Sequence, residues 1–396
     1  MISKSTWIIF ISMLLSSCSS NIPPTINAPS TEPIRASSSE AAQTPNLNSD
    51  LVIYRGDLGR SGNFNAGYIP APITIQWEYE FAPSVHGAPI LAGDILFVPS
   101  VAGRFAALNV TSGQKLWEFT ASGKLFSSPA IVNDTVYVGN ENGNLYALDA
   151  INGNEVWSLK LDSGIWSAPL VAEDMIFVGS QNGTFYAIDL FTHDILWQFK
   201  TNGWVISPPA WENSMLFFSG GPSLYALDAA TGMQLWEKSV GEFWGPLSVV
   251  GKVIYVGNDD NSFYALNAYT GAAIWSFDAG DDGWSAPAVT DQTVFFGNRL
   301  NRLFALSIQT GELRWEFETE DWVTTDPVVA NDIIYLAVGN HDNREGPRPL
   351  YALNAETGEE LWKFMADGRL LTPPAVGDNT LYVVSFPGTV YALTNP

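Results

Sequence analysis

The chain has 396 residues, of which 46% are hydrophobic and only 15% are charged. A disordered chain would be poorer in apolar residues and a coiled coil richer in charged ones, so both classes are excluded. The formal net charge of −23 would repel phosphate groups, which argues against nucleic acid or an anionic lipid surface as a partner. The 34 glycines and 24 prolines indicate many short strands joined by tight turns.

The first residues have the pattern of an export signal. Lys4 provides a positive charge, and an apolar run of nine residues from Trp7 to Leu15 follows it. Nine residues in a helix extend about 13 Å, far less than the roughly 30 Å of a bilayer's hydrocarbon core. The run is therefore expected to be the apolar part of a signal peptide over residues 1–17, and not a membrane-spanning helix.

The signal ends in Leu15-Ser16-Ser17-Cys18, which resembles a bacterial lipobox. The resemblance implies that Cys18 receives lipid and becomes the mature N-terminus, so that acyl chains anchor the protein to a membrane without crossing it. Cys18 is the only cysteine, which excludes an intrachain disulfide and a cysteine-based metal site. An ordinary secretory signal with an unrelated cysteine is the alternative.

The stretch after this cysteine is dominated by Ser, Pro, Thr and Asn and has no periodic apolar pattern. Residues 18–50 are therefore expected to be the lipidated cysteine followed by a disordered tether. A flexible segment of this length has a typical end-to-end distance of about 30 Å, which would hold the folded part at that distance from the bilayer. The folded domain is expected to span residues 51–396.

Tryptophan recurs about every 40 residues through the rest of the chain. Four strands of about five residues, with four turns, account for about 40 residues, which is the size of one four-stranded propeller blade. The alternation of apolar residues with period two and the frequent glycines argue against helical repeats of similar length. The recurring residues are Trp77, Trp117, Trp157, Trp197, Trp236, Trp275, Trp315 and Trp362.

The two ends of the repeat region complement each other. The last unit begins near Leu370 and stops after three strands at Thr394, whereas residues 73–81 form an outer strand with no unit before it. Pairing of these segments would complete an eighth blade and leave no exposed sheet edge. The sequence therefore predicts an all-β fold: an eight-bladed β-propeller of four-stranded antiparallel blades, closed by pairing of its N- and C-terminal strands.

The repeat resembles a known family. The pattern Ala-x-Asp-x-x-x-Gly-x-x-x-Trp, present as Ala147, Asp149, Gly153 and Trp157, is similar to the docking motif of pyrroloquinoline-quinone-type (PQQ-like) propeller repeats. The resemblance implies that each tryptophan packs between neighbouring blades, so the eight recurring tryptophans are assigned to the architecture. Residues 51–72 contain a segment similar to the lead-in that precedes bacterial propellers of this type.

No signature of an enzyme accompanies the repeats. In quinoprotein dehydrogenases of this fold, the resemblance implies a cofactor held against a vicinal cysteine disulfide and a calcium ion, and this chain has a single cysteine. The sequence lacks a nucleophile elbow, a His-Glu-x-x-His motif and a phosphate-binding loop. His86, His193 and His341 are far apart, and His193 replaces the motif glycine of its repeat. We therefore expect a protein that is not an enzyme, with no cofactor and no metal ion.

A second set of aromatic residues lies at the predicted crossings from the outer strand of one blade to the inner strand of the next. This set is expected to ring the mouth of the central channel. Such residues either fill the tapering channel or form a hydrophobic recognition surface, since Trp and Phe are frequent in protein interfaces. The candidate partner-binding residues in this set are Phe126, Trp166, Trp204, Trp244, Trp284 and Trp322.

The last repeat interval is 47 residues instead of 40. The extra residues fall in the connection 340–349, between the second and third strands of the seventh blade, on the face that carries the aromatic set. His341, Arg344 and Arg348 are candidate partner-binding residues, because Arg is enriched at interfaces and insertions in repeats often mark the binding face. A tolerated surface insertion is the alternative.

The signal, the tether, the blade count and the lack of catalytic residues resemble the BamB-type lipoproteins of the outer-membrane β-barrel assembly machinery. The resemblance implies a non-catalytic, membrane-anchored scaffold that binds a protein partner in the bacterial cell envelope. We expect a monomeric, exported protein on the outer membrane facing the periplasm, or on the outer face of the cytoplasmic membrane where no outer membrane exists. A cell-surface binder of sugars or peptides and a degenerate quinoprotein dehydrogenase are the alternatives.

Overall fold

The computed structural model describes residues 47, 51–64, 69, 71, 73–81, 84–239, 245–281, 285–339 and 346–395. The chain divides into two units, residues 1–43 and residues 44–396, and all described residues belong to the second. The export signal, Cys18 and most of the tether lie outside the described residues. Within the described part, no helix is both long and apolar enough to cross a membrane.

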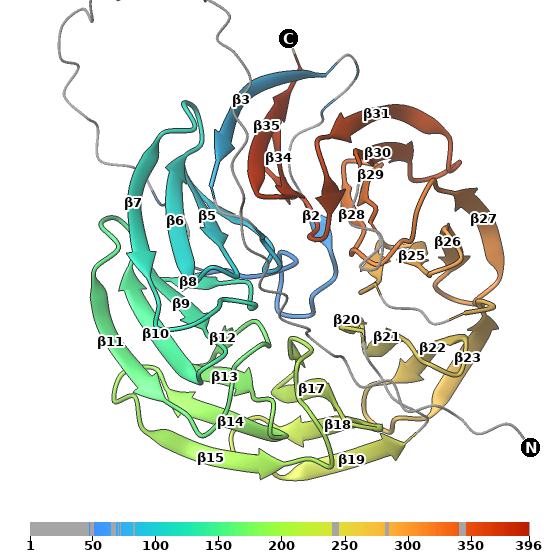
Figure 1. Cartoon of the computed structure of the whole chain (residues 1–396). Helices are drawn as coiled ribbons and strands as arrows, with labels where there is room; N and C mark the ends of the chain where they lie inside the picture. Colours follow the sequence, from blue (N-terminus) through green and yellow to red (C-terminus); the bar gives the residue numbers. More distant parts are fainter. Residues whose placement is uncertain are drawn as a thin grey trace, which may run out of the picture. The chain divides into compact units, whose positions relative to one another are not determined.

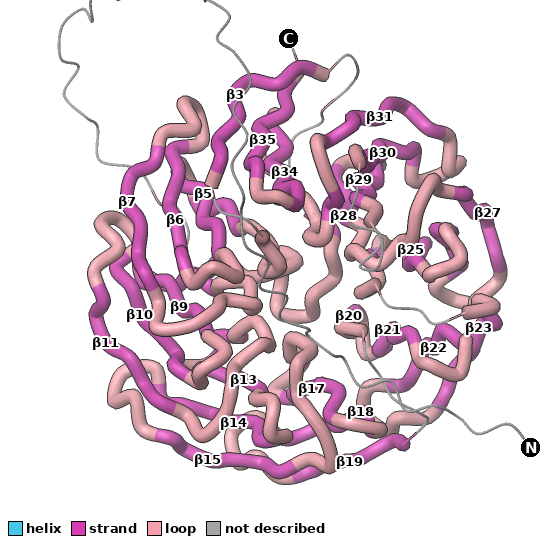
Figure 2. The backbone as a smooth tube through the Cα atoms, viewed as in Figure 1, coloured by secondary structure: helices cyan, strands magenta, loops and turns pink. Residues whose placement is uncertain are grey.

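Eight β-sheets form a ring around a common centre (Figure 1). Figure 2 shows the described backbone as strands joined by loops and turns. From the inner to the outer strand, blades 1–4 are β4 (Ile90–Ala92), β5 (Ile95–Pro99), β6 (Arg104–Asn109), β7 (Lys115–Thr120); β8 (Ala130–Val132), β9 (Thr135–Gly139), β10 (Asn144–Asp149), β11 (Glu155–Lys160); β12 (Leu170–Ala172), β13 (Met175–Gly179), β14 (Thr184–Asp189), β15 (Ile195–Lys200); and β16 (Ala210–Glu212), β17 (Met215–Gly220), β18 (Ser223–Asp228), β19 (Gln234–Ser239). Blades 5–8 are β20 (Ser248–Val250), β21 (Val253–Gly257), β22 (Ser262–Asn267), β23 (Ala273–Asp278); β24 (Ala288–Val289), β25 (Thr293–Gly297), β26 (Arg302–Ser307), β27 (Leu313–Glu318); β28 (Val328–Ala330), β29 (Ile333–Ala337), β30 (Arg348–Asn354), β31 (Glu360–Ala366); and β33 (Ala375–Val376), β34 (Thr380–Phe386), β35 (Thr389–Thr394), β3 (Thr74–Glu80).

The eighth blade joins the two ends of the propeller. Its outer strand β3 is antiparallel to β35, with Thr74 opposite Thr394 and Glu80 opposite Thr389. A short additional strand, β32 (Arg369–Leu370), also pairs with β34. The predicted all-β class, the eight four-stranded blades and the closure by the terminal strands are therefore confirmed.

Two further short strands lie at the inner side of the ring. β1 (Leu51–Val52) pairs antiparallel with β8 of blade 2, and β2 (Asn63–Phe64) pairs parallel with β28 of blade 7. Both belong to the lead-in, which therefore extends the inner edges of two blades to five strands each.

The turn type of the hairpins between first and second strands explains why Asn and Asp are frequent in these hairpins. Asn133 and Asp134 have φ values of +46° and +62°, and Glu173 and Asp174 repeat these values in the next blade. Two consecutive residues with positive φ make a type I′ turn, whose twist matches that of an antiparallel strand pair. Asn and Asp adopt this conformation more readily than most residues that have a side chain.

The repeated motif forms the turn between the third and fourth strands. Asp149 Oδ1 accepts hydrogen bonds from the backbone N–H groups of Ile151 and Asn152, both at 2.9 Å, and so closes the turn. Gly153 follows with a φ of +75°, and the indole of Trp117 from the preceding blade lies against it. A Cβ at this position would collide with the ring, so both the backbone conformation and the space require glycine.

Tryptophan side chains join consecutive blades at these turns. Trp236 lies against Gly271 of the next blade, and its Nε1 donates a hydrogen bond to the carbonyl of Ala268 at 2.8 Å. In the unit where His193 replaces the glycine, Trp157 stacks on the imidazole with ring centroids 4.2 Å apart. Other indoles that donate to a carbonyl beyond their own blade are Trp77, Trp117, Trp197, Trp275, Trp315 and Trp362.

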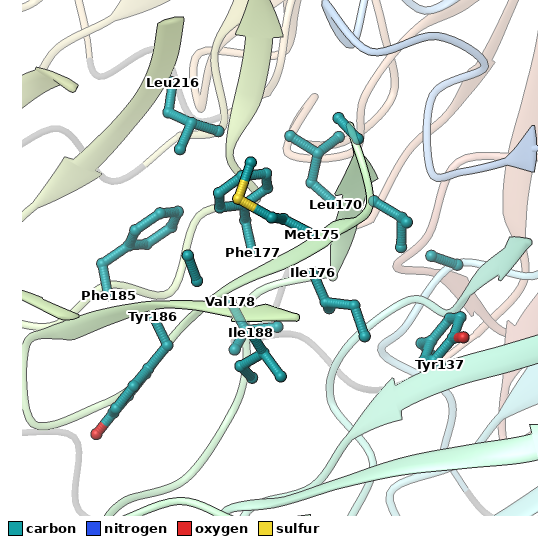
Figure 3. Packing of buried hydrophobic residues seen from close by; sticks show 14 of the residues in the cluster. Tyr137, Leu170, Met175, Ile176, Phe177, Val178, Phe185, Tyr186, Ile188 and Leu216 are labelled. Carbon is teal, nitrogen blue, oxygen red and sulfur yellow. The ribbon is translucent and has the colours of Figure 1, made fainter. Parts of the chain in front are cut away.

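The hydrophobic core lies between the faces of neighbouring blades. The second strands, such as β13 and β17, are buried along their whole length because both of their faces are covered. Figure 3 shows one cluster, in which Phe177 and Phe185 of blade 3 lie between Tyr137 of blade 2 and Leu216 of blade 4. Burial of this kind drives the stacking of blades around the ring.

Among the residues that the structure describes, the outer strand of each blade is paired along one edge only, which corrects the expectation that closure leaves no exposed sheet edge. A β-bulge interrupts each outer strand just before the docking tryptophan, and in β11 the extra residue is Val156. A bulge bends the strand and breaks the row of free backbone groups, which hinders pairing with another chain. The equivalent residues are Gln76, Leu116, Leu196, Leu235, Ile274, Arg314 and Leu361.

Candidate protein-binding face

The two faces of the ring are built from different connections. One face, which we call the crossing face, carries the crossings between blades and the connections between second and third strands. The opposite face, which we call the hairpin face, carries the type I′ hairpins and the turns of the docking motif. The described residues of the crossings are 81, 84–89, 121–129, 161–169, 201–209, 245–247, 279–281, 285–287, 319–327 and 367–374.

Hydrogen bonds fix the backbone of a crossing on both sides of its candidate residue. Before Trp166, the backbone N–H of the buried Ile165 donates to the carbonyl of Asn140 at 2.9 Å. After it, Ser167 Oγ accepts a hydrogen bond from the N–H of Gly179 at 2.7 Å. A serine or threonine recurs at this position in other crossings, although it belongs neither to the docking motif nor to the tryptophan spacing. The equivalent residues are Ser127, Ser207, Ser285 and Thr325.

Three half-buried rings from consecutive crossings, His86, Phe126 and Trp166, form a continuous row of contacts, which we call the aromatic arc. The ring centroids of Phe126 and Trp166 are 4.4 Å apart, and His86 packs edge-on against Phe126 at 5.8 Å. Such contacts stabilise aromatic pairs beyond the area that they bury. Trp166 Nε1 is buried and has no hydrogen-bond partner among the described residues, so it is a donor that a ligand could use.

Trp204 lies in the next crossing, before blade 4, and its side chain is 51% exposed. Its backbone is nevertheless fixed, because its carbonyl accepts a hydrogen bond from the N–H of Gly221 at 3.2 Å. A large exposed aromatic side chain on a fixed backbone is typical of an interface anchor. Trp244 and Trp284, which were predicted for the same set, lie outside the described residues.

Trp322 lies three crossings further on and is half-buried. The guanidinium of Arg299 lies 5.7 Å from the centroid of its indole ring, and Arg299 Nη2 is 3.5 Å from a carboxylate oxygen of Asp281. The carbonyl of Trp322 accepts a hydrogen bond from Gly339 at 3.1 Å, which joins this crossing to the start of the predicted loop. Trp322 therefore lies at the crossing into blade 7, apart from the aromatic arc, which lies at the crossings into blades 1–3.

The loop 340–349 is described only from residue 346 onward, so His341 and Arg344 lie outside the described residues. Arg348 begins β30, and its Nε is 2.5 Å from a carboxylate oxygen of Asp321. Both side chains are mostly shielded from water, at 13% and 11% exposed. Arg348 thus connects the loop to the crossing of Trp322, a role that the repeat interval did not indicate.

The centre of the ring contains two arginines from the lead-in, which the repeat pattern does not single out. Arg60 is fully buried, and its guanidinium donates to the carbonyls of Pro209 at 3.0 Å and Pro169 at 3.1 Å. Arg55 is 3% exposed, and its Nη1 lies 3.3 Å from a carboxylate oxygen of Asp326. A pair of arginines in a glycine-rich segment of an acidic protein was the only sequence signal for this arrangement.

The electrostatics of this buried group follow from its burial. Loss of water around Arg60, together with repulsion from Arg55, lowers the pKa of Arg60 to about 9, which leaves it charged at neutral pH. Burial, with the nearby Asp326 carboxylate, raises the pKa of Tyr54, whose hydroxyl donates to Asp326. Arg55 is therefore held by the Asp326 carboxylate and backbone carbonyls, and Arg60 by backbone carbonyls with the Asp57 carboxylate nearby.

Eight four-stranded blades joined by tryptophans define a β-propeller of the PQQ-like repeat class. The sequence matches the model of the family described as "Outer membrane protein assembly factor BamB" over residues 73–164, 107–212, 160–242, 194–316, 281–344 and 323–395, and the chain belongs to this family. The resemblance inferred from the sequence is therefore confirmed. A comparison with curated protein sequences finds no similar protein.

Solved structures with the same fold include both assembly proteins and enzymes. BamB from Moraxella catarrhalis superposes with a TM-score of 0.66 at 22% identity, covering 82% of this chain and 98% of that chain. Quinohemoprotein alcohol dehydrogenase from Comamonas testosteroni has a TM-score of 0.73 at 16% identity, covering 89% and 81%. A europium-containing methanol dehydrogenase has a TM-score of 0.73 at 13% identity, covering 89% and 99%. At these identities the likeness shows the fold alone.

The quinone that such dehydrogenases suggest does not fit the residues of this chain. The lead-in and its buried arginines fill the centre of the ring, and the single cysteine cannot form the vicinal disulfide implied for the enzymes. Among the described residues, no group of three or more His, Cys, Asp or Glu side chains converges as a metal site would require.

Proposed function

We propose that this protein is a non-catalytic scaffold of the bacterial cell envelope that binds a protein partner through its crossing face. The observation that carries the proposal is the aromatic arc next to Trp204, which places aromatic surface on four consecutive crossings. Aromatic anchors on a fixed backbone supply most of the binding energy in many interfaces, because little side-chain entropy is lost on binding.

The partner is a component of outer-membrane protein assembly in this proposal. Membership of the BamB family supports this role, since that family is described as an outer membrane protein assembly factor. An acidic chain with a net charge of −23 favours a partner whose docking surface is neutral or basic. The candidate residues that lie outside the described part, Trp244, Trp284, His341 and Arg344, belong to the same proposed surface.

A pair of exposed aromatic residues on opposite faces provides the test. Trp204 is 51% exposed on the crossing face, and Phe191 is 67% exposed in a turn of the hairpin face. The full chain and its Trp204→Ala and Phe191→Ala variants would be purified by affinity from the solubilised envelope of the host, and bound proteins identified by mass spectrometry. We expect enrichment of a β-barrel assembly protein with the parent chain and with Phe191→Ala, and its loss with Trp204→Ala.

The melting temperature separates a lost contact from a damaged fold. Both variants remove exposed side chains, so their melting temperatures are expected to stay close to that of the parent. Equal enrichment of the assembly protein with Trp204→Ala and the parent would overturn the assignment of this face. A parent chain that enriches no β-barrel assembly protein would overturn the assembly role.

The membrane anchor is a separate part of the proposal and rests on Cys18. Lipid at this cysteine would place the protein in the membrane fraction, because the acidic folded part has no affinity for an anionic bilayer. We expect Cys18→Ser to move the protein into the soluble fraction of the envelope, and mass spectrometry of the parent to find lipid on a chain that begins at Cys18. An unmodified Cys18 in the membrane fraction would contradict the anchor.

A further inference from the structure

The lead-in follows the inner wall of the ring instead of passing across its surface. β1 runs along β8 with Val52 opposite Ile131, and β2 runs along β28 with Asn63 opposite Val329. Between these two strands, residues 53–62 lie at the centre of the ring (Figure 1). The segment 51–64 therefore enters beside blade 2 and leaves beside blade 7.

The backbone of this segment is bound by successive blades in the manner of an added strand. The carbonyls of Leu58 and Gly59 accept hydrogen bonds from Trp211 N at 2.8 Å and from Val249 N at 2.7 Å. The next two contacts are made by Ser61, whose carbonyl accepts from Val289 at 2.8 Å, and by Gly62, whose carbonyl accepts from Val329 at 2.9 Å. Blades 4, 5, 6 and 7 thus each contribute one N–H group from the second or middle residue of their inner strand.

The approach is too close for most side chains. A Cβ on Gly59 would collide with the carbonyl oxygen of Val249, and backbone atoms of an inner strand cannot move aside cheaply. Gly62 has a φ of +66°, and a Cβ there would collide with the guanidinium of Arg55. The inner wall therefore requires glycine at position 59, whereas the glycine at position 62 leaves room for Arg55 of the segment itself.

The two arginine side chains supply the polar contacts of this site. Arg60 donates to Pro169 of blade 3 and Pro209 of blade 4, while Arg55 donates to Ala286 at 3.1 Å and to Pro287 of blade 6. These carbonyls precede the inner strands, and a buried carbonyl that loses its donor costs about 1–3 kcal/mol. The carbonyl of Pro287 also accepts a hydrogen bond from Ser248 Oγ at 2.7 Å. Charged donors make the stronger hydrogen bonds to such carbonyls.

We infer that the central channel is a binding site for an extended peptide with two arginines, and that residues 51–64 occupy it as an intramolecular ligand. The covalent link through residues 65–72 is then not what holds the segment in place. The inner wall holds it through the pairing of β1 on blade 2, the four hydrogen bonds of blades 4–7, of which the last belongs to the pairing of β2 on blade 7, and the arginine contacts with blades 3, 4 and 6. This inference does not depend on the proposed protein partner, because it concerns the wall of the channel and not the crossing face.

The test is to cut the link in the folded protein. A protease recognition sequence inserted between Phe64 and Ile69 of the full chain would allow cleavage after folding, and size-exclusion chromatography in native buffer would follow the N-terminal fragment. We expect the fragment to co-elute with the propeller. Loss of the fragment from the cleaved parent would overturn the inference, whatever the state of the remaining propeller.

Two variants of the cleavable protein test whether contacts with the channel wall retain the N-terminal fragment. Gly59→Ala places a methyl group against Val249, and Arg60→Lys leaves one ammonium group in place of a guanidinium that contacts three carbonyls. We expect the fragment to dissociate at least about tenfold faster from either variant, which corresponds to the loss of a single good hydrogen bond. The matched control is Arg302→Ala on an exposed ion pair with Glu316, which should not change the rate. Equal rates in all four proteins would overturn the inference, even if one variant melts at a lower temperature.

Discussion

The propeller is held together from two sides, and the two sides differ in how their contacts are distributed. On the outside, docking tryptophans such as Trp236 join one blade to the next, and the same contact recurs around the ring. Trp362 is the exception, because it donates to Ile69 of the lead-in. At the centre, a single segment of fourteen residues, 51–64, is hydrogen-bonded to six of the eight blades, from blade 2 to blade 7. A repeated contact spreads the stabilisation over many residues, whereas the lead-in concentrates it in a few. The comparison teaches that residues seen only once in a repeat protein can matter more than those seen eight times.

The largest effect is expected from Arg60→Ala. The substitution leaves the carbonyls of Tyr54, Pro169 and Pro209 without their donor and creates a cavity at the centre of the ring. At about 1–3 kcal/mol for each unsatisfied buried group, the free energy of unfolding should fall by roughly 4 kcal/mol or more. Urea unfolding followed by tryptophan fluorescence measures this change. If Arg60→Ala lowers the free energy of unfolding by less than the alanine substitution of one docking tryptophan does, the outer contacts and not the central ones dominate the stability.

A docking tryptophan should have the next largest effect. Trp236→Ala removes a half-buried indole that lies against Gly271 and donates to Ala268, and we expect a loss of about 3 kcal/mol. Trp236→Phe keeps most of the ring contact and removes only the indole donor, so its expected loss is about 1 kcal/mol. The same urea titration compares the two variants. Equal losses would show that the hydrogen bond, and not the ring contact, dominates the docking.

Alkaline pH should weaken the blades through their buried phenols. Burial raises the pKa of Tyr255 and the pKa of Tyr382 to about 12, above the value of 10.0 expected in the unfolded chain. Between pH 10 and 12 the unfolded chain loses these protons while the folded chain keeps them, so stability is complete below pH 10 and falls through this interval. Absorbance at alkaline pH reports phenolate formation, and thermal melts at the same pH values report stability. The contribution of each buried phenol is the difference in absorbance between the parent and its Tyr255→Phe or Tyr382→Phe variant, and a difference already complete at pH 10 without unfolding would contradict the raised pKa values.

The smallest effect is expected from His193→Gly. His193 has a φ of +64°, which glycine adopts without strain, and its ring stacks on Trp157 at 4.2 Å. Relief of about 1 kcal/mol of backbone strain opposes the loss of about 1 kcal/mol of ring contact. At the equivalent position of another unit, Gly232→Ala would add a side chain where φ is +71° and place its Cβ 2.6 Å from the ring of Trp197. This substitution should lower the stability clearly. Melting temperatures of the two variants test whether the turn needs glycine for its conformation and its space together.

The fold was predictable because the sequence pattern that specifies one blade recurs along the chain. The period of about 40 residues gives the blade, and the unmatched strands at residues 73–81 and 389–394 give the closure. Even the motif residues have local explanations, since Asp149 closes a turn and Gly153 leaves room for Trp117. Eight copies of a pattern make each of these features visible against the rest of the sequence.

The centre of the ring was not predictable in the same way. Arg60 contacts carbonyls that are 109 and 149 residues away, and these distant partners leave no period or local spacing in the sequence. The candidate face was predictable only in part, because the crossings could be located but not their exposure. Trp204 and Trp166 both precede an inner strand, and only neighbouring side chains decide that one is exposed and the other stacked.

The strand directions have a practical consequence for how this molecule can be handled. β1 begins at Leu51, opposite Val132 and beside a hairpin, and β35 ends at Thr394, opposite Thr74. Both positions lie on the hairpin face, so a fluorescent label, an affinity tag or a linkage to a sensor surface at either one points away from the aromatic arc. A protein immobilised through either position would offer its crossing face to solution in a single orientation, which is the arrangement that surface-based binding measurements require.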